Sequence, residues 1–325
     1  MGKTMERYGK SRLATCCAAY AFVLCVTACL VLLPAAFGQG KGGPQKSFAT
    51  PEDAANALAA AYQKGDRKTV AEILGDKAWR LVFSGDPVID RHERAWFLSL
   101  YEEGHEVVTE GDKSAVLQLG TDGQPYPISI IKQGARWRFD PSEGHEDLLS
   151  RRISKAELTA LNLMVAYVDA QREYHQKDYS GRGAGEYAQR FRSTPGQKDG
   201  LYWEGATDKA AGPIAALVEA ASKEGYLPTK EGDLPVYRGY VYKMLTAQGP
   251  RASGGARQYI VNGRMTEGLA LVAFPVRYGV SGIMTFMVNQ GSVIYQKDLG
   301  TKTVELGRKM THFNPDKTWT KGQAK

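Results

Sequence analysis

Three histidine–glutamate pairs come closest in this sequence to the ligand set of a metal-dependent enzyme. A zincin motif needs a second histidine four residues after the first, because both side chains then lie on one helix face and bind zinc. The pairs begin at His92, His105 and His145, and the positions of the second histidine hold Trp96, Thr109 and Leu149. The pattern therefore predicts no zinc site, and we expect neither a metal ion nor another cofactor.

Three further patterns resemble functional sites but have simpler structural explanations. The acidic cluster at 143–147 lacks the alternating oxygen ligands and the rigid turn of a calcium loop. The glycine-rich segment 181–185 follows a predicted helix, whereas a dinucleotide fingerprint follows a strand. Asp169 and Glu173 lie one helical turn apart, which is typical of a solvated or salt-bridged helix face.

The stretch 279–300 predicts two strands around a turn. A hydrolase elbow centred on Ser281 would need a glycine where Ile283 stands. Alternating side chains over 283–288, followed by turn-forming residues at 289–292, predict a β-hairpin instead. No nucleophile motif is present, so enzymatic activity stays uncertain and we favour its absence.

Aromatic side chains are concentrated in the second half, which holds twelve of the 17 tyrosines. Such rings bury area and keep a polar tip, so they are suited to line a groove for a glycan or peptide. The candidate binding residues are Tyr187, Tyr202, Trp203, Tyr240, Tyr242 and Tyr278. The simpler alternative is that tyrosine is common in strands, where it packs against its neighbours.

Residues 1–38 have the composition of a secretory signal. Four basic residues precede an uncharged run, 13–37, which ends in small residues just before Gln39. We expect cleavage there, followed by a linker at 39–47 that is mobile as far as Lys46. An uncleaved membrane anchor formed by 13–37 is the second alternative, and a lipid on Cys29 is the third.

Cysteine usage and charge limit the remaining function classes. All four cysteines lie inside 1–38, so we expect no disulfide and no thiol chemistry in the mature chain. Residues 1–38 hold four basic residues and one acidic residue, which leaves 38 basic against 34 acidic residues. This balance argues against a nucleic-acid partner. We expect a periplasmic or extracellular protein, with membrane contact only through 13–37 if that segment is not cleaved.

Changes in hydrophobic periodicity predict two α+β domains, 48–141 and 154–320, joined by the segment 142–153. In the first domain, helices capped by Thr50, Asp66 and Asp90 precede four short strands. This order resembles the cystatin-like or nuclear-transport-factor-like roll, a sheet backed by helices. In the second domain, a helix beginning at Ser154 is expected to pack an apolar stripe on the hairpin at 283–297: Leu158, Leu161, Val165 and Val168.

Seven segments spread over most of the mature chain carry a family resemblance. They are SGDPVIDR (84–91), ARWRFD (135–140), YVDAQREY (167–174), EYAQRFRSTPGQKDGLYW (186–203), LTAQGP (245–250), YIVNGRM (259–265) and FPVRYGVSGIMTFMVNQGSVIYQKDLG (274–300). Together they resemble the bacterial family of exported proteins known as domain of unknown function 2950, over roughly 48–320. The resemblance implies a location in the envelope or outside the cell and brings no established activity or catalytic residues.

A second resemblance concerns the second domain alone. A helix containing Gln171 and Tyr174, a variable loop and a sheet ending in the hairpin are similar to the globular head of type IV pilins and pseudopilins. A pilin head lies directly on its N-terminal apolar helix, whereas a whole domain intervenes here. Filament assembly by the usual packing is therefore not expected.

The favoured hypothesis is a non-catalytic binding or assembly module of the cell envelope, with an envelope protein, a glycan or a peptide as its partner. The alternative is an envelope hydrolase or glycan-processing enzyme that uses Asp or Glu side chains of the tyrosine-rich second domain. Two carboxylates facing each other about 5–10 Å apart in a cleft would favour the enzyme.

Overall fold

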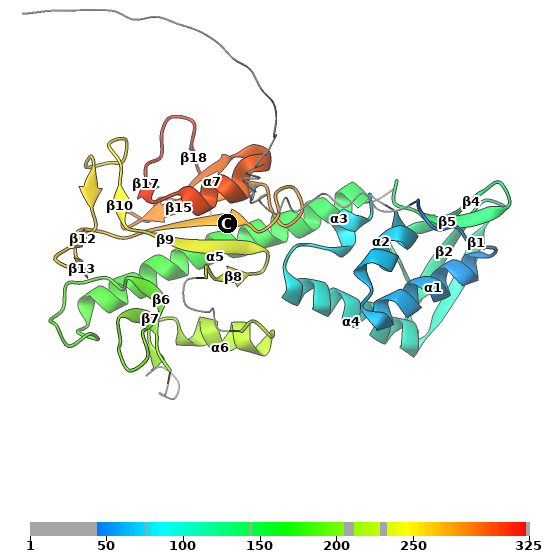
Figure 1. The fold of residues 1–325 in the computed structure, drawn as a ribbon, viewed down its shortest axis with the longest axis horizontal. Helices are drawn as coiled ribbons and strands as arrows, with labels where there is room; N and C mark the ends of the chain where they lie inside the picture. The colour runs from blue at the N-terminus through cyan, green and yellow to red at the C-terminus, as the bar shows by residue number, and fades with distance from the viewer. Residues whose placement is uncertain (1–43, 76, 143–144, 205–210, 228–232, 323–325) are drawn as a thin grey trace, which may run out of the picture. The chain divides into compact units, whose positions relative to one another are not determined.

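The computed structural model describes residues 44–75, 77–142, 145–204, 211–227 and 233–322. These residues contain seven α-helices and several antiparallel sheets, which confirms the predicted α+β class (Figure 1). Within these ranges, no helix is both long enough and apolar enough to cross a membrane. The predicted signal segment 1–38 and all four cysteines lie outside the described residues.

Four helices open the described chain, and short polar side chains cap three of them. They are α1 (Pro51–Lys64), α2 (Arg67–Leu74), α3 (Trp79–Val82) and α4 (Pro87–Glu103). As predicted, Thr50 accepts a hydrogen bond from the backbone N–H of Asp53, and Asp66 accepts one from Thr69. The predicted cap at Asp90 is wrong. Helix α4 begins one turn earlier, with Asp86 as its cap and Pro87 at its first position.

The first sheet is antiparallel, and its strands pair in the order β1-β2-β4-β5, with β3 beside β2. Its strands are β1 (His105–Glu110), β2 (Ser114–Leu119), β3 (Gln124–Pro125), β4 (Ser129–Gln133) and β5 (Arg136–Asp140). The inward side chains of β2, Ala115, Leu117 and Leu119, are buried against the helices. The sheet therefore has one face on a core that it shares with α1, α2 and α4.

The end of the predicted mobile linker is fixed to this core. The side-chain amide of Gln45 donates hydrogen bonds to the carbonyl oxygens of Ile73 and Phe139, at 3.1 and 2.7 Å. The next residue, Lys46, forms an ion pair with Glu72 at 3.2 Å. The prediction of mobility is therefore wrong for Gln45 and Lys46, because both bond to ordered elements.

Helix α5 (His145–Gln176) is the longest element of the described chain. It begins nine residues before the predicted start at Ser154 and passes without a break through most of the expected connecting segment. Its buried side chains include Leu149 and Ile153 in the first core and Met164 and Val168 in the second. Independent folding of 48–141 and 154–320 stays a prediction.

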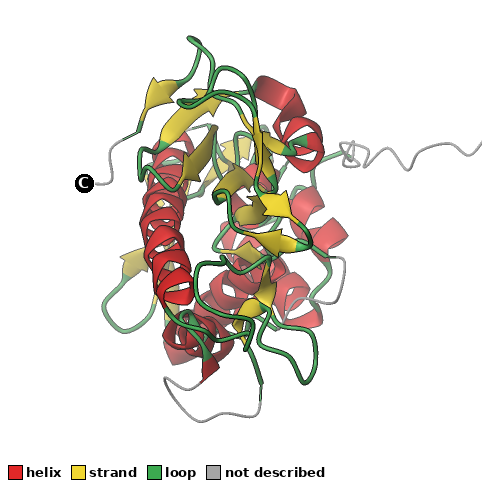
Figure 2. Cartoon of the chain, turned by 90° about the vertical axis from the view of Figure 1, so that its left-hand side faces the viewer, coloured by secondary structure: helices red, strands yellow, loops and turns green. Residues whose placement is uncertain are grey.

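A second antiparallel sheet forms the centre of the remaining chain, with strands in the order β18-β16-β15-β14-β9-β8. These are β8 (Val236–Tyr237), β9 (Tyr240–Leu245), β14 (Ala270–Pro275), β15 (Met284–Asn289), β16 (Tyr295–Asp298) and β18 (Thr320–Lys321). Strands β15 and β16 form the predicted hairpin. All six residues of β14 are buried, because α5 covers one face of the sheet and α7 (Thr303–Lys309) contacts the other. Figure 2 shows strands with one long helix on their left and shorter helices on their right.

The predicted contact between α5 and the hairpin exists, but half of the predicted stripe is wrong. Leu161 and Val168 are buried in the same core as Phe286 and Val288. Leu158 and Val165 are each 44% exposed. Their places against the sheet are taken by small or flexible side chains one or two positions away: Ala156, Ala160 and Met164.

Short elements complete the second half around this sheet. They are β6 (Arg190–Arg192), β7 (Gly200–Tyr202), α6 (Ala215–Lys223), β10 (Ala247–Gln248), β11 (Arg257–Gln258), β12 (Ile260–Val261), β13 (Arg264–Met265), the 3-10 helix η2 (Gly300–Lys302) and β17 (His312–Phe313). Strands β6 and β7 pair in parallel, and α6 contacts β7.

Candidate functional site

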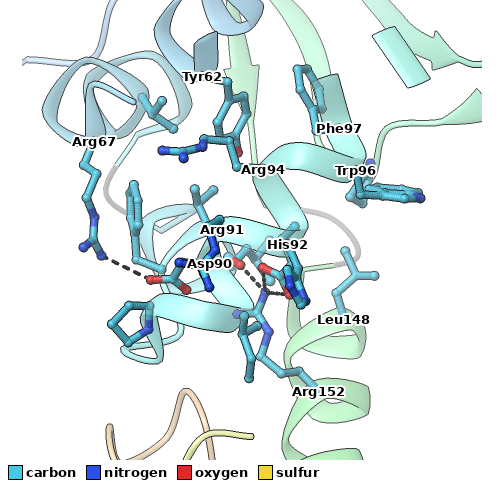
Figure 3. Close-up of a pocket in the computed structure, with 18 of the residues that line it drawn as sticks. Tyr62, Arg67, Asp90, Arg91, His92, Arg94, Trp96, Phe97, Leu148 and Arg152 are labelled. Atoms are coloured by element: carbon cyan, nitrogen blue, oxygen red, sulfur yellow. Dashed lines mark hydrogen bonds and ion pairs between the residues drawn. The ribbon is translucent and has the colours of Figure 1, made fainter. Parts of the chain in front are cut away.

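A cavity with a volume of about 840 Å³ is built mainly by helix α4 (Figure 3). We call it the α4 cavity. Helices α1, α2 and α5 supply further wall residues, and the connection between β3 and β4 supplies others. Three residues from far along the chain complete the lining: Glu224, Tyr226 and Arg238. A volume of this size is in the range of ligand sites.

Helical spacing turns one face of α4 into the cavity. Asp90, Glu93 and Phe97 lie at positions i, i+3 and i+7, so they share a face and all line the cavity. Phe97 is buried between Tyr62 and Tyr126, with ring centroids 4.7 and 5.3 Å away. The back of the cavity is therefore aromatic, and its polar groups lie nearer the start of the helix.

Asp90 is held by contacts on both carboxylate oxygens. One oxygen accepts hydrogen bonds of 2.7 Å from the backbone N–H and from the hydroxyl of Ser84. The other lies 3.3 Å from the guanidinium of Arg67, as Figure 3 shows. Burial raises the pKa of Asp90 above its ordinary value, although the Ser84 hydrogen bonds and the Arg67 charge act in the opposite direction.

Glu93 is held by an arginine from another element. Nη2 of Arg152, on α5, donates to both carboxylate oxygens of Glu93, at 3.0 and 2.9 Å. The same guanidinium donates to the carbonyl oxygens of Arg80 and Leu81 and is thereby fixed. Burial raises the pKa of Glu93; the charge of Arg152 lowers it and the nearby Asp90 raises it further.

The third carboxylate of the cavity is also paired. Oε1 of Glu224 accepts from Arg238 at 2.6 Å and from the hydroxyl of Tyr237 at 3.0 Å. The hydrogen bonds from Arg238 lower the pKa of Glu224. Each carboxylate of the α4 cavity is thus engaged by its own arginine.

Positive charge remains after these pairs are formed. The lining contains six cationic side chains, Arg67, Arg91, Arg94, Arg152, Lys155 and Arg238, against three carboxylates. Within the described ranges, Arg91, Arg94 and Lys155 form no ion pair with a carboxylate. Trp96, which also lines the cavity, is half-exposed. The arrangement is suited to hold an anion that also carries an apolar or ring-shaped part.

Buried polar residues fix this wall to the second half of the chain. Asp86, which is fully buried, caps α4 by accepting from the backbone N–H of Val88. Its second oxygen accepts from the Tyr226 hydroxyl and from the backbone N–H of Gly239, both at 2.9 Å. The segment SGDPVIDR therefore positions α4 through Asp86 and also supplies Asp90 and Arg91 to the cavity.

The six tyrosine and tryptophan side chains predicted to bind a ligand do not line the α4 cavity. Trp203, Tyr240 and Tyr242 are buried in the core beneath α5, while Tyr187, Tyr202 and Tyr278 are partly exposed. Tyr202 and Tyr242 line a second, smaller cavity. A binding role for the six residues stays a prediction.

Local spacing assigned Asp90 and Glu93 to a helix capping box, and Glu93 also to a histidine–glutamate pair; neither pattern indicated a cavity. The one available signal was the segment SGDPVIDR, which contains both an acidic and a basic residue at the start of a helix.

Among the described residues, no group of three or more His, Cys, Asp or Glu side chains is arranged to hold a metal ion.

Comparison with known proteins places most of this chain in one family. Residues 45–321 match the family described as Protein of unknown function (DUF2950). No curated protein and no solved structure matches the chain. The resemblance to pilin heads is not supported. Because the match covers nearly all of the described residues and every segment that suggested it, the chain belongs to the family Protein of unknown function (DUF2950).

Proposed function

We propose that this chain is an exported, non-catalytic binding protein of the cell envelope and that its α4 cavity holds an anionic ligand. The observation that carries this proposal is the charge arrangement of the lining. Three carboxylates are each engaged by an arginine, and Arg91, Arg94 and Lys155 remain without a carboxylate partner among the described residues. A ligand carboxylate would supply the missing charge, and its apolar part would contact Trp96.

The experiment is titration of the mature chain with acidic peptides and with carboxylate-bearing glycan fragments, each beside its amidated, neutral counterpart. Only the charged member of each pair should bind. The triple substitution Arg91→Gln, Arg94→Gln and Lys155→Gln should weaken binding at least tenfold, since a hydrogen bond to a charged group contributes about 1.5–3 kcal/mol. Arg151→Gln is the matched control, because Arg151 is exposed on α5 outside the cavity. Equal binding of charged and amidated ligands would refute the proposal.

A hydrolase is the second candidate, and one observation favours it. Asp90 and Glu93 lie in one cavity, and the pKa of each is raised, as in many catalytic acids. Against catalysis, Arg67 and Arg152 occupy both groups. Glu93→Gln separates the two functions: a binding protein keeps its affinity for the anion, whereas an enzyme loses turnover of a bound glycan or peptide.

Export remains part of this proposal. Its support is the composition of 1–38 and the family resemblance carried by the segments from 84 to 300. N-terminal sequencing of the protein from its host should find a chain that begins near Gln39. A chain that begins at Met1, or one with a lipid on Cys29, would contradict cleavage at this point.

For the first half we propose the cystatin-like or nuclear-transport-factor-like roll, on the basis of its element order.

A further inference from the structure

A second cavity lies between helix α6 and the core beneath it, with a volume of about 190 Å³. We call it the α6 cavity. Its walls come from α5 (Leu163 and Tyr167), from β7 (Leu201), and from the central sheet (Tyr242 and Leu271). Tyr226 is the one described residue that lines both this cavity and the α4 cavity. The α6 cavity is therefore a separate space with its own chemistry.

The face of α6 that lines the cavity is apolar. Four side chains at helical spacing line the cavity: Ile214, the residue just before α6, and Leu217, Val218 and Ala221 on α6. An amphipathic helix normally buries such a face, yet no residue of α6 is buried. The apolar face of α6 therefore borders a hollow rather than a packed core. Among the described lining residues, Arg192 is the single charged one.

One polar group in the wall has no hydrogen-bond partner among the described residues. Tyr242 is 5% exposed, and its hydroxyl makes no hydrogen bond within the described residues. Burial raises the pKa of Tyr242 well above its ordinary value, so the phenol is neutral and carries a proton to donate. Buried hydroxyls are nearly always hydrogen-bonded in folded proteins. An unpartnered donor in the wall of an apolar hollow is a candidate partner for a ligand acceptor.

We propose that the α6 cavity binds a small, neutral, apolar compound with one carbonyl oxygen, which accepts a hydrogen bond from Tyr242. The size follows from the volume, because an engineered apolar cavity of about 150 Å³ holds benzene. A benzene ring with a short carbonyl substituent therefore matches the available space. The scarcity of charge in the lining excludes an ionised ligand, because burying an unpaired charge is costly. This site does not depend on the anion site of the α4 cavity.

The test uses two ligands of almost the same shape, acetophenone and its hydrocarbon counterpart α-methylstyrene, with the mature chain. Affinities are measured by ligand-observed NMR titration. The parent should bind acetophenone about 2- to 12-fold more tightly, which is the ratio that a net hydrogen bond provides. Tyr242→Phe should remove this difference and leave the affinity for α-methylstyrene unchanged. Equal affinities of the parent for both ligands would overturn the role of Tyr242.

A neighbouring pair of alanines tests the location of the site. Ala221→Phe fills the cavity and should abolish binding of both ligands, whereas Ala220→Phe, on the exposed side of α6, should leave binding unchanged. Thermal unfolding of both variants establishes that they are folded; should Ala221→Phe fail to fold, the Tyr242→Phe comparison still decides. The proposal is wrong if neither ligand binds the parent at millimolar concentration, or if folded Ala221→Phe binds as the parent does.

Discussion

Asp86 accepts a hydrogen bond of 2.9 Å from the hydroxyl of Tyr226, a residue 140 positions further along the chain. The same carboxylate caps α4 and accepts from the backbone N–H of Gly239. Because Asp86 is fully buried, all of its donors would lose their partner together if the carboxylate were removed.

Asp86→Ala should therefore lower the free energy of unfolding by about 3 kcal/mol or more, since it removes a helix cap and leaves two buried donors unsatisfied. Tyr226→Phe, which removes one of these donors, should cost about 1–2 kcal/mol. Urea unfolding measures both. Asp66→Ala is the control for the loss of a cap alone and should cost less than Asp86→Ala. Equal effects of Asp66→Ala and Asp86→Ala would show that the contacts with Tyr226 and Gly239 contribute nothing.

Two adjacent residues of α5 should differ strongly in how much the same substitution destabilises the protein. Met164 is fully buried in the second core, and Val165 is 44% exposed. Met164→Asp should lower the free energy of unfolding by about 3–5 kcal/mol, because it buries an unpaired carboxylate. Val165→Asp should change it by less than about 1 kcal/mol. Thermal or urea unfolding of the two variants decides, and a larger effect at Val165 would mean that the buried face of α5 is assigned wrongly.

Glu186 should contribute stability that depends on pH. Its side chain is 4% exposed, and burial alone would raise its pKa. Hydrogen bonds from Ser180 and Arg264, with the charges of Arg182 and Arg264, outweigh burial and lower the pKa. A lowered pKa in the folded state means that ionised Glu186 stabilises the fold, and that this contribution is lost as the pH falls below about 4.3, the ordinary pKa of glutamate.

Glu186→Gln should therefore be less stable than the parent at pH 7, by about 1–2 kcal/mol. The difference should shrink as the pH is lowered through the folded-state pKa of Glu186. Urea unfolding between pH 7 and pH 3 measures this change. Glu219→Gln, in an exposed pair on α6, should leave stability almost unchanged at every pH. A pH-independent difference for Glu186→Gln would refute the role given to its charge.

Gly307 is in the middle of α7, where alanine would ordinarily be the better helix former. Here a Cβ atom at residue 307 would come within 2.5 Å of the Phe274 ring on β14. Gly307→Ala should therefore destabilise the protein, by about 1–3 kcal/mol, despite its higher helix propensity. Arg308→Ala, at the next and exposed position, should be nearly neutral. Thermal unfolding of both variants measures the effect, and a more stable Gly307→Ala variant would contradict the close contact between α7 and the sheet.

The sequence predicted the ends of helices correctly where they depend only on neighbouring residues. Thr50 and Asp66 cap helices as expected because a cap depends on residues three positions away. Asp86 and Asp90 both precede helical residues, and the local pattern does not show which one caps α4. The structure assigns the cap to Asp86, while Asp90 bonds to Ser84.

Long-range contacts account for the remaining differences. The predicted stripe on α5 favoured large side chains such as Leu158 and Val165, whereas close packing on the sheet uses Ala156 and Ala160. The α4 cavity depends on Arg152, which reaches Glu93 across 59 positions of sequence. No spacing rule connects residues at that separation, so the sequence did not predict the cavity.

The continuity of α5 restricts which changes of length the chain can accept. Ile153 belongs to the first core and Ala156 to the second, and both lie on the same uninterrupted helix. One inserted residue between them would turn every later side chain by about 100° around the helix axis. Met164 would then leave its place against the sheet, and the polar Thr159 would take the buried place of Ala160. Insertions at this point should therefore be accepted only when their length restores the helical phase, as about seven residues (two turns) do. This restriction holds even though the sequence itself is not repetitive.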